Sequence, residues 1–237
     1  MKTLLLRLAA PIQSWGMDKF ERRGTERTPT KSAVIGMIAS ALGRSRSDSI
    51  EDLMNLKFAV RTDCEGMVLR DFQVSALPSG NNSYITNRYY LADAVFLAGL
   101  EGDEDLLRHV DVAIKKPYYP LYLGRRSCPP EGQVSLGIYE DALMDVMAKH
   151  PLLASDWHKQ YLWRRQDRVY LRLVGDAEDN AKAVYTLSDH AISFDPKKRK
   201  YSSRRVKEYP NVIIDKPHGR DHKQTTLHDP FSTIKEG

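Results

Sequence analysis

The segment that decides the fold is TLLLRL at residues 3–8, together with the segment TPTKSAVIGMIASALG at residues 28–43. Four leucines around a single arginine predict a buried first strand, which Pro11 ends soon afterwards. In the second segment apolar residues recur at helical spacing, with Thr30 as a candidate N-cap and Gly43 as a candidate stop. The chain is therefore expected to open with a strand followed by a helix.

Outward from this unit, further strands and helices follow. The predicted elements are a short helix over residues 48–53, strands over 57–63, 67–76 and 88–100, a helix over 103–116 and a strand over 134–139. The turn-forming run PSGNNS at residues 78–83 marks a hairpin tip. The order β-α-β-β-α-β predicts an α+β, ferredoxin-like (RRM-like) domain, an arrangement that many RNA-binding proteins use.

Beyond the last of these strands the composition changes. We expect a short helix over residues 143–154 and strands within 157–174, where aromatic, basic and apolar residues alternate. Residues 195–223 carry ten Lys and Arg against four Asp and Glu, a net charge of +6, whereas the whole chain carries +5. The basic charge is therefore localised, as in proteins that contact a polyanion. These features predict a ferredoxin-like domain over residues 1–140 and a small, β-rich, basic C-terminal extension and tail over 141–237.

The composition limits the class of protein. With 237 residues, of which 41% are hydrophobic, the chain can bury a sizeable core. Its pI of about 9.1 is consistent with a nucleic-acid partner. Two cysteines, Cys64 and Cys128, form neither a disulfide framework nor a zinc signature, so we expect a reducing, cytoplasmic setting and no cofactor or metal. The first ten residues are too short to span a bilayer and lack a secretory-signal pattern, so no membrane partner is expected.

The strongest candidate site is the loop YPLYLGRRSCPP at residues 119–130. Arg125 and Arg126 offer forked donors that match phosphate, and Ser127 adds a hydroxyl donor. Gly124 lets a backbone approach a ligand closely. These residue types suit a phosphate-rich polymer better than a small metabolite. The alternative is a basic surface loop whose tyrosines pack into the core.

Further candidates for RNA binding lie outside this arginine pair. Lys31 and Ser32 sit at a predicted helix N-terminus, where free N–H groups and the helix dipole favour anions. Trp15 and Tyr122 could each stack a splayed base, and core packing is the alternative for both. The remaining candidates are basic side chains that would supply charge to a groove or face solvent: Arg22, Arg23, Arg27 and Arg88.

Sequence blocks in a fixed order add a family resemblance. The blocks are LRLAAPIQSWG at residues 6–16, TPTKS at 28–32, RYYLADA at 88–94 and KPYYPLYLGRRSCP at 116–129. In this order and spacing they resemble the fifth family of CRISPR-associated proteins, the RAMP subunits of type I-E Cascade surveillance complexes. The resemblance covers roughly residues 1–140, and the C-terminal third is less distinctive.

The resemblance implies a non-catalytic, RNA-binding subunit. Such proteins bind and cap the 5′ handle of the CRISPR RNA at one end of the seventh-family backbone subunits. They also contact the large subunit that reads the PAM, and they help to assemble the complex for recognition of foreign DNA. The implied partners are therefore CRISPR RNA, the Cascade backbone and large subunits, and target DNA within the complex.

The resemblance also implies roles for particular segments. Arg125 and Arg126 would clamp handle phosphates or base edges. A hairpin called the thumb, which projects from the ferredoxin-like body in this family, would lie near residues 71–90 with its tip at 79–82. The basic run at 197–207 would grip target DNA or the guide backbone, or face solvent on an appended hairpin.

The alternative is a metal-independent endoribonuclease of the same fold that processes CRISPR repeat RNA. Such an enzyme needs a general base and a general acid, and histidine suits both roles. The seven histidines all lie outside the matched blocks: His109, His150, His158, His190, His218, His222 and His228. No two-metal carboxylate cluster, Walker A loop, G-x-S-x-G or H-E-x-x-H motif occurs, so we expect a binding subunit. A generic ferredoxin-like RNA-binding protein outside CRISPR is a third alternative, which the ordered motifs disfavour.

Overall fold

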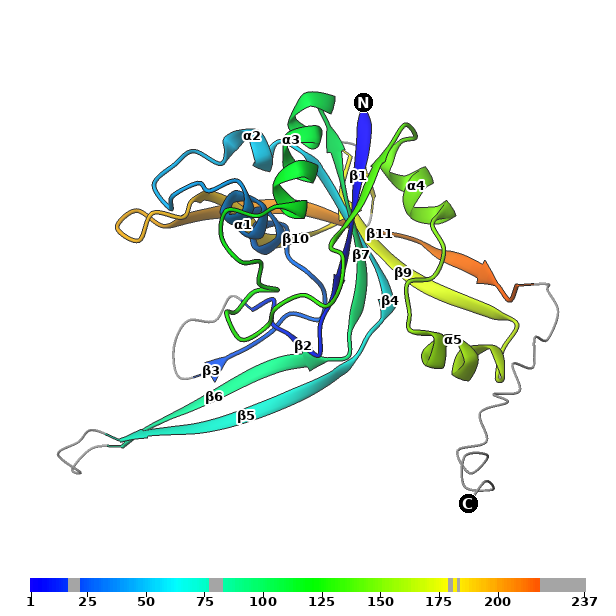
Figure 1. Ribbon diagram of the computed structural model, residues 1–237, viewed down its shortest axis with the longest axis horizontal. Coiled ribbons are helices and arrows are strands. Elements are labelled where there is room, and N and C mark those ends of the chain that lie inside the picture. The colour runs from blue at the N-terminus through cyan, green and yellow to red at the C-terminus, as the bar shows by residue number, and fades with distance from the viewer. Residues whose placement is uncertain (17–21, 77–82, 179–180, 183, 218–237) are drawn as a thin grey trace, which may run out of the picture.

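The computed structural model of the protein describes residues 1–16, 22–76, 83–178, 181–182 and 184–217. Most strands belong to one large antiparallel sheet (Figure 1). In chain order they are β1 (Lys2–Ala9), β4 (Lys57–Cys64), β7 (Val95–Gly102), β8 (Ser135–Tyr139), β9 (Arg168–Asp176), β10 (Val184–Ser193) and β11 (Lys200–Asp215). Their order across the sheet is β10-β11-β9-β4-β7-β1-β8. Because β9 pairs with β4, strands far apart in the sequence build one continuous sheet.

A smaller sheet carries a long hairpin that projects from the body (Figure 1). Its strands are β2 (Ile12–Gln13), β3 (Arg22–Arg23), β5 (Met67–Ala76) and β6 (Ser83–Ala92). β5 and β6 pair antiparallel along their whole length, and the short β3 runs parallel to β6. The predicted strand over residues 67–76 is confirmed. The predicted tip at residues 79–82 lies outside the described residues.

One predicted strand is in fact two. We predicted a single strand over residues 88–100, but the chain leaves β6 at Ala92 and enters β7, in the other sheet, at Val95. Between them Asp93 has a φ of 57°, a left-handed conformation that aspartate tolerates better than most residues. Its N–H donates to the carbonyl of Pro11 at 3.1 Å. Apolar residues on both sides conceal this turn in the sequence.

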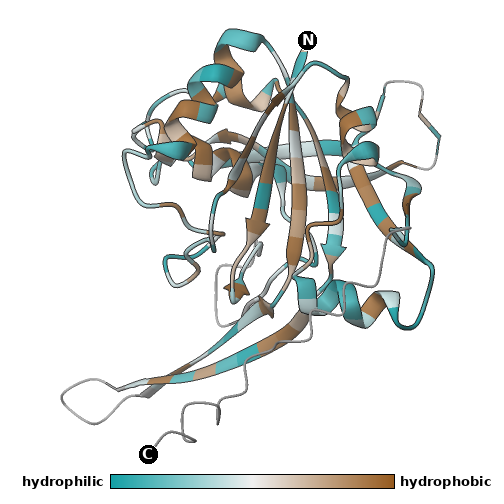
Figure 2. Ribbon diagram, turned by 45° about the vertical axis from the view of Figure 1, so that its right-hand side comes forward, coloured by the Kyte–Doolittle hydropathy of each residue, from teal (hydrophilic) through white to brown (hydrophobic). Residues whose placement is uncertain are grey.

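Helices cover both faces of the large sheet. They are α1 (Lys31–Ala41), α2 (Glu51–Met54), α3 (Glu104–Lys115), α4 (Leu143–Lys149) and α5 (Asp156–Trp163). Side chains of β1 alternate between the faces: Leu4 and Leu6 share a core cluster with α1 and α3, whereas Leu5 packs with α4. β1 is therefore buried on both sides, which explains its nearly continuous apolar sequence (Figure 2). Within the described ranges, no helix is long and apolar enough to cross a membrane.

The first strand and the first helix form where the sequence predicts them. Thr30 occupies the N-cap position with extended backbone, although its side chain makes no capping hydrogen bond. Gly43 follows the helix with a φ of 77°, so the predicted stop is confirmed. The strands predicted over residues 57–63 and 134–139 and the helix over 103–116 also form, each within a residue or two.

The region after β8 contains the largest error of the sequence analysis. The helix predicted over residues 143–154 ends at Lys149, because Pro151 cannot continue it. Where strands were predicted from residue 157, the chain forms α5 instead. Ser155 caps the N-terminus of this helix, since its hydroxyl accepts a hydrogen bond from the N–H of His158 at 3.3 Å. Only from Arg168 onward is the predicted strand confirmed, as β9.

Candidate nucleic-acid interface

The loop that carries the two adjacent arginines is a closed turn. The N–H of Leu123 donates to the carbonyl of Cys128 at 2.8 Å, and the N–H of Cys128 donates to the carbonyl of Arg125 at 2.9 Å. Leu123 and Cys128 are both fully buried in the core. These two anchors fix the turn and present residues 124–127 at the surface.

The backbone conformation and close packing at position 124 require glycine. Its φ is 92°, and a Cβ at this position would lie 1.6 Å from the carbonyl oxygen of Ser14. The N–H of Ser14 also donates to the carbonyl of Leu123 at 3.1 Å. The close approach that the sequence predicted for a ligand is therefore made by the backbone of the protein itself.

Arg125 is tied into the protein. Its two terminal nitrogens donate to the carbonyls of Tyr89 at 3.3 Å and Gly24 at 3.2 Å, and its Cζ lies 4.8 Å from the ring centre of Tyr90. Burial acts to raise the pKa of Tyr90, but hydrogen bonds from Ser127 and Arg125 and the charge of Arg125 outweigh it, so this pKa lies below its ordinary value. The guanidinium of Arg125 thus binds backbone carbonyls of the protein itself. Ser127 belongs to the same cluster, because it hydrogen-bonds Tyr90.

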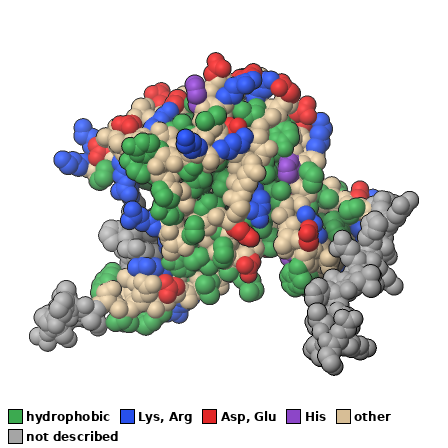
Figure 3. Space-filling view, viewed as in Figure 1, with side chains coloured by type: hydrophobic (Ala, Val, Ile, Leu, Met, Phe, Trp, Pro, Cys, Tyr) green, Lys and Arg blue, Asp and Glu red, His purple; other side chains and the backbone are tan. Residues whose placement is uncertain are grey.

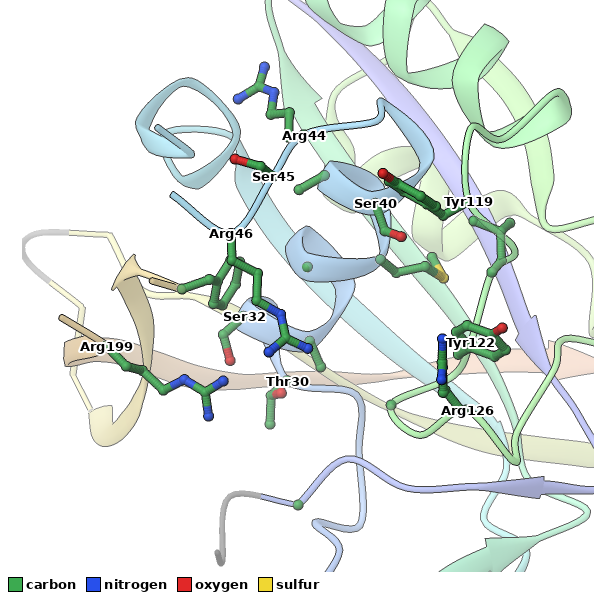
Figure 4. Close-up of a pocket in the computed structure, with 18 of the residues that line it drawn as sticks. Thr30, Ser32, Ser40, Arg44, Ser45, Arg46, Tyr119, Tyr122, Arg126 and Arg199 are labelled. Atoms are coloured by element: carbon green, nitrogen blue, oxygen red, sulfur yellow. The ribbon is translucent and has the colours of Figure 1, made fainter. Parts of the chain in front are cut away.

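Arg126 differs from its neighbour. Its side chain is exposed, and no hydrogen bond or ion pair joins it to another described residue. In Figure 4 it lies beside Tyr122 at one side of a pocket. Of the two predicted phosphate clamps, Arg126 is therefore the one that remains available.

This pocket, which we term the arginine groove, has a volume of about 940 Å³ and runs along α1. Its polar and aromatic lining comes from four segments: Thr30, Ser32 and Ser40; Arg44, Ser45 and Arg46; Tyr119, Tyr122 and Arg126; and Ser188, Phe194, Arg199 and Tyr201. Figure 4 shows Arg46 and Arg199 extending into the same space in front of Ser32. In the space-filling view, Lys and Arg side chains gather at the edge formed by the β10–β11 turn (Figure 3).

The charged side chains that line the groove are all positive among the described residues. Among the described residues that line it, four are arginines and none is Asp or Glu. Arg44 is partly neutralised, because its Nη1 lies 2.6 Å from a carboxylate oxygen of Asp52. No ion pair joins Arg46 or Arg199 to any residue that the structure describes. Exposed guanidinium groups interleaved with tyrosine rings and hydroxyls are suited to the phosphates and bases of single-stranded nucleic acid.

The N-terminus of α1 was predicted to bind an external anion, whereas in the structure a carboxylate of the protein itself occupies the N–H of Lys31. The N–H of Lys31 already donates to a carboxylate oxygen of Asp189 at 2.9 Å, and its ammonium lies 3.1 Å from Asp176. Arg204 makes a two-pronged contact with Asp189, at 2.8 and 2.7 Å, and also binds Asp176. Burial lowers the pKa of Lys31, against the opposing effect of Asp176. We call these four residues, Lys31, Asp176, Asp189 and Arg204, the α1 ion network. Of the two residues predicted at this helix N-terminus, Ser32 lines the groove and Lys31 does not.

The other predicted residues lie apart from the groove or inside the core. Trp15 is 1% exposed, and its indole N–H donates to the side chain of Gln13 at 3.2 Å, so it packs in the core and cannot stack a base without opening it. Arg27 is exposed on the loop before α1. Arg88 is half-buried on β6. Arg22 and Arg23 form β3, opposite Asn87 and Arg88; their side chains are not described.

Sequence reasoning missed part of the groove. Arg44 and Arg46 directly follow the Gly43 stop, and this R-S-R run after a helix was the available signal. Arg199 lay within the basic run at 197–207 but was not singled out. That run does not act as one surface, because Arg204 is held in the α1 ion network while Arg199 is exposed in the groove. No group of three or more potential metal ligands occurs in the described part of the chain.

Comparison with known proteins gives consistent matches. The family described as CRISPR-associated protein (Cas_Cas5) matches residues 3–207. The chain is 35% identical over 158 residues to the CRISPR system Cascade subunit CasD of Escherichia coli (strain K12), covering 56% of this chain and 70% of that protein.

Solved structures agree with these sequence matches. A chain described as a Cas protein is 33% identical, with a TM-score of 0.69 and coverage of 89% of this chain and 94% of that chain. A chain from a CRISPR RNA-guided surveillance complex is 30% identical, with a TM-score of 0.74 and coverage of 90% and 91%.

Proposed function

Because the chain belongs to the Cas5 family of CRISPR-associated proteins, we propose that it is a non-catalytic subunit of a Cascade-type surveillance complex. In this role it binds and caps the 5′ handle of the CRISPR RNA and helps to assemble the complex for RNA-guided recognition of foreign DNA. Its partners are the CRISPR RNA, the backbone and large subunits, and target DNA within the complex. A guide-RNA subunit of this kind acts in the cytoplasm.

The arginine groove is the observation that carries the proposal. Arg46, Arg126 and Arg199 converge on one space from three separate segments, with no acidic side chain among the described lining residues. A neutral ligand would leave these charges uncompensated, whereas successive phosphates of an RNA strand would pair with them. Tyr119 and Tyr122 add rings against which unpaired bases can stack.

The topology supports the finer assignment of the fold. Strands β4, β7, β1 and β8 are consecutive antiparallel neighbours, and α1 and α3 provide the two crossovers that join them. This is the strand order of a ferredoxin-like unit, which we assign to the region before residue 140. The β5–β6 hairpin, inserted between β4 and β7, is then the thumb. Its exposed apolar residues are suited to contact with a neighbouring subunit: Met67, Leu69, Phe72, Val74, Tyr84 and Ile85.

Two triple variants, each of which loses three positive charges, test the proposal. One replaces Arg46, Arg126 and Arg199 by alanine; the other replaces Arg108, Lys115 and Lys149, which lie on α3 and α4 away from the groove. Binding of CRISPR RNA with and without its 5′ handle is measured across a salt series. The groove variant should lose handle-dependent binding, with the slope of log Kd against log salt falling by about 0.7 for each lost phosphate contact. Equal losses in both variants would show that the groove has no specific role.

The same RNA separates binding from cleavage. None of the histidines that the structure describes lines the groove, so it offers no imidazole as general base. We therefore expect labelled repeat RNA to stay intact during incubation without metal. Cleavage that disappears when one histidine is replaced would assign the endoribonuclease function instead.

A further inference from the structure

The helix α5 has an unusual exposure for an element of a folded domain. None of its eight residues is buried. Leu162 and Trp163 are partly buried against the second core cluster, which holds the helix in place. Its outward side carries the largest exposed ring of the described chain, Trp157, which is 72% exposed. A helix this short gains little stability on its own, and the exposed indole adds nothing to the core.

Three side chains on the outward side form a ladder. Trp157 and Tyr161 lie four residues apart on α5, which places one above the other, and Arg165 follows four residues later, just beyond the end of the helix. The rings of Trp157 and Tyr161 are stacked, with centres 5.8 Å apart and planes inclined by 20°. The Cζ atom of Arg165 lies 4.0 Å from the centre of the Tyr161 ring, and its Nη1 binds the tyrosine hydroxyl. The ladder therefore presents flat surfaces in a fixed orientation, and Trp157 is its open end.

The charge around the ladder is positive. Over residues 156–168 the chain has four Lys and Arg and two Asp. Lys159 is 3.7 Å from Asp156 and Arg168 is 2.8 Å from Asp215, so these two cations are partly compensated. Arg164 has no ion pair with any described residue, and Arg165 contacts only an aromatic side chain among them. The uncompensated charge thus lies next to the ladder.

We propose that this surface, the α5 platform of Trp157, Tyr161, Arg164 and Arg165, binds single-stranded nucleic acid. An unpaired base stacks on the open face of Trp157 and extends the existing ladder, while Arg164 and Arg165 pair with the adjacent phosphates. Figures 1 and 2 place α5 on the opposite side of the molecule from α1 and the arginine groove. The platform is therefore a second contact, separate from the site proposed for the RNA handle.

Charge and shape favour nucleic acid over a protein partner. Tryptophan, tyrosine and arginine also dominate protein interfaces, but there they sit among apolar contacts that exclude water. On α5 the one aliphatic residue, Leu162, turns toward the core. The platform instead combines parallel rings with uncompensated arginines, which is complementary to stacked bases on a phosphate backbone.

The test uses the full chain with the three groove arginines already replaced by alanine, so that only binding outside the groove is measured. The probe is a fluorescently labelled ten-nucleotide oligouridine, followed by anisotropy at low salt. Trp157→Ala should weaken binding by roughly 5- to 150-fold, the range measured for removal of one stacking aromatic, and Trp157→Phe should retain most of it. As a matched control, Tyr170→Ala removes another exposed aromatic residue, on β9, and should leave binding unchanged.

Trp157 is exposed, so these variants should fold normally, which circular dichroism checks. Unchanged affinity of Trp157→Ala would overturn the proposal. So would a Trp157→Ala chain with an intact groove that binds oligouridine normally but fails to join the backbone and large subunits, because the platform would then be a protein-docking surface. Since the groove is already disabled in this experiment, its outcome does not depend on whether the groove holds the RNA handle.

Discussion

Two adjacent regions of the molecule use basic side chains in opposite ways. In the α1 ion network, Lys31 is buried and the side chain of Arg204 is only 9% exposed, and each contacts a carboxylate from β9 or β10. In the arginine groove beside the same helix, the arginines project into open space, and all but Arg44 lack an acidic partner among the described residues. The comparison teaches that the role of a basic residue in this protein depends on whether the fold surrounds it with acceptor groups of its own.

The largest effect should come from breaking the α1 ion network. Arg204→Ala leaves the carboxylate of Asp189, which is 1% exposed, without its two-pronged partner. Removing one member of a buried ion pair costs about 3–5 kcal/mol, because the remaining charge stays desolvated. Urea denaturation should show this loss as a shift of the unfolding midpoint. Arg199→Ala, which removes an exposed groove arginine, should change the free energy of unfolding by no more than about 0.5 kcal/mol.

A loss of under about 1 kcal/mol in Arg204→Ala would mean that solvent reaches Asp189 readily, and the contrast between the two regions would weaken. Arg204→Lys sharpens the test. It keeps the charge but loses the planar fork that holds both carboxylate oxygens, so its stability should lie between those of the wild type and the alanine variant.

The second prediction concerns the two neighbouring arginines of the closed turn. Arg125→Ala removes two hydrogen bonds to backbone carbonyls and a cation–π contact, so it should lower the free energy of unfolding by about 2 kcal/mol. Arg126→Ala should leave thermal stability unchanged and weaken binding of handle RNA. Both variants are measured by thermal unfolding and by RNA binding: Arg125→Ala should lose stability, and Arg126→Ala should lose RNA affinity. The reverse pattern would place Arg126 in the framework and Arg125 at the RNA.

These contrasts explain what the sequence could and could not predict. The apolar run of β1 and the helical spacing of α1 are local patterns, and both elements form as expected. The outward presentation of Arg126 also follows from a local feature, a glycine and two prolines around a short turn. The partner of Lys31, in contrast, lies 158 residues away in the sequence, and one partner of Arg125 lies 101 residues away. No local pattern reveals such distant carboxylates and carbonyls, so the sequence could not show that Lys31 and Arg125 have partners within the protein.

The errors in secondary structure have the same origin. In α5, aromatic and basic residues alternate as they do in many strands, and only the Ser155 cap and the four-residue spacing of Trp157 and Tyr161 favour a helix. The turn at Asp93 is set by its contact with Pro11 and by the fact that β6 and β7 belong to different sheets. Tertiary contacts decided both cases.

The smallest expected effect separates two arginines within the groove. Arg44 and Arg46 both line it, but the guanidinium of Arg44 binds Asp52 and, at 2.9 Å, the carbonyl of Ser49. A phosphate would have to compete with these contacts at Arg44 and meets no such competition from described residues at Arg46. Arg46→Ala should therefore weaken binding of handle RNA about 5-fold, equivalent to about 1 kcal/mol, and Arg44→Ala less than about 2-fold.

Asp52→Asn tests the cause of this difference directly. It removes the carboxylate that holds Arg44 and adds no cation, so Arg44 becomes free to pair with phosphate. We expect RNA affinity to rise by about 2-fold in fluorescence anisotropy at fixed salt, and to return to the wild-type value when Arg44→Ala is added. If Arg44→Ala and Arg46→Ala weaken binding equally, or if Asp52→Asn changes nothing, then an ion pair at the rim does not withhold an arginine from RNA. In that case only burial, as in the α1 ion network, would distinguish structural from binding arginines in this protein.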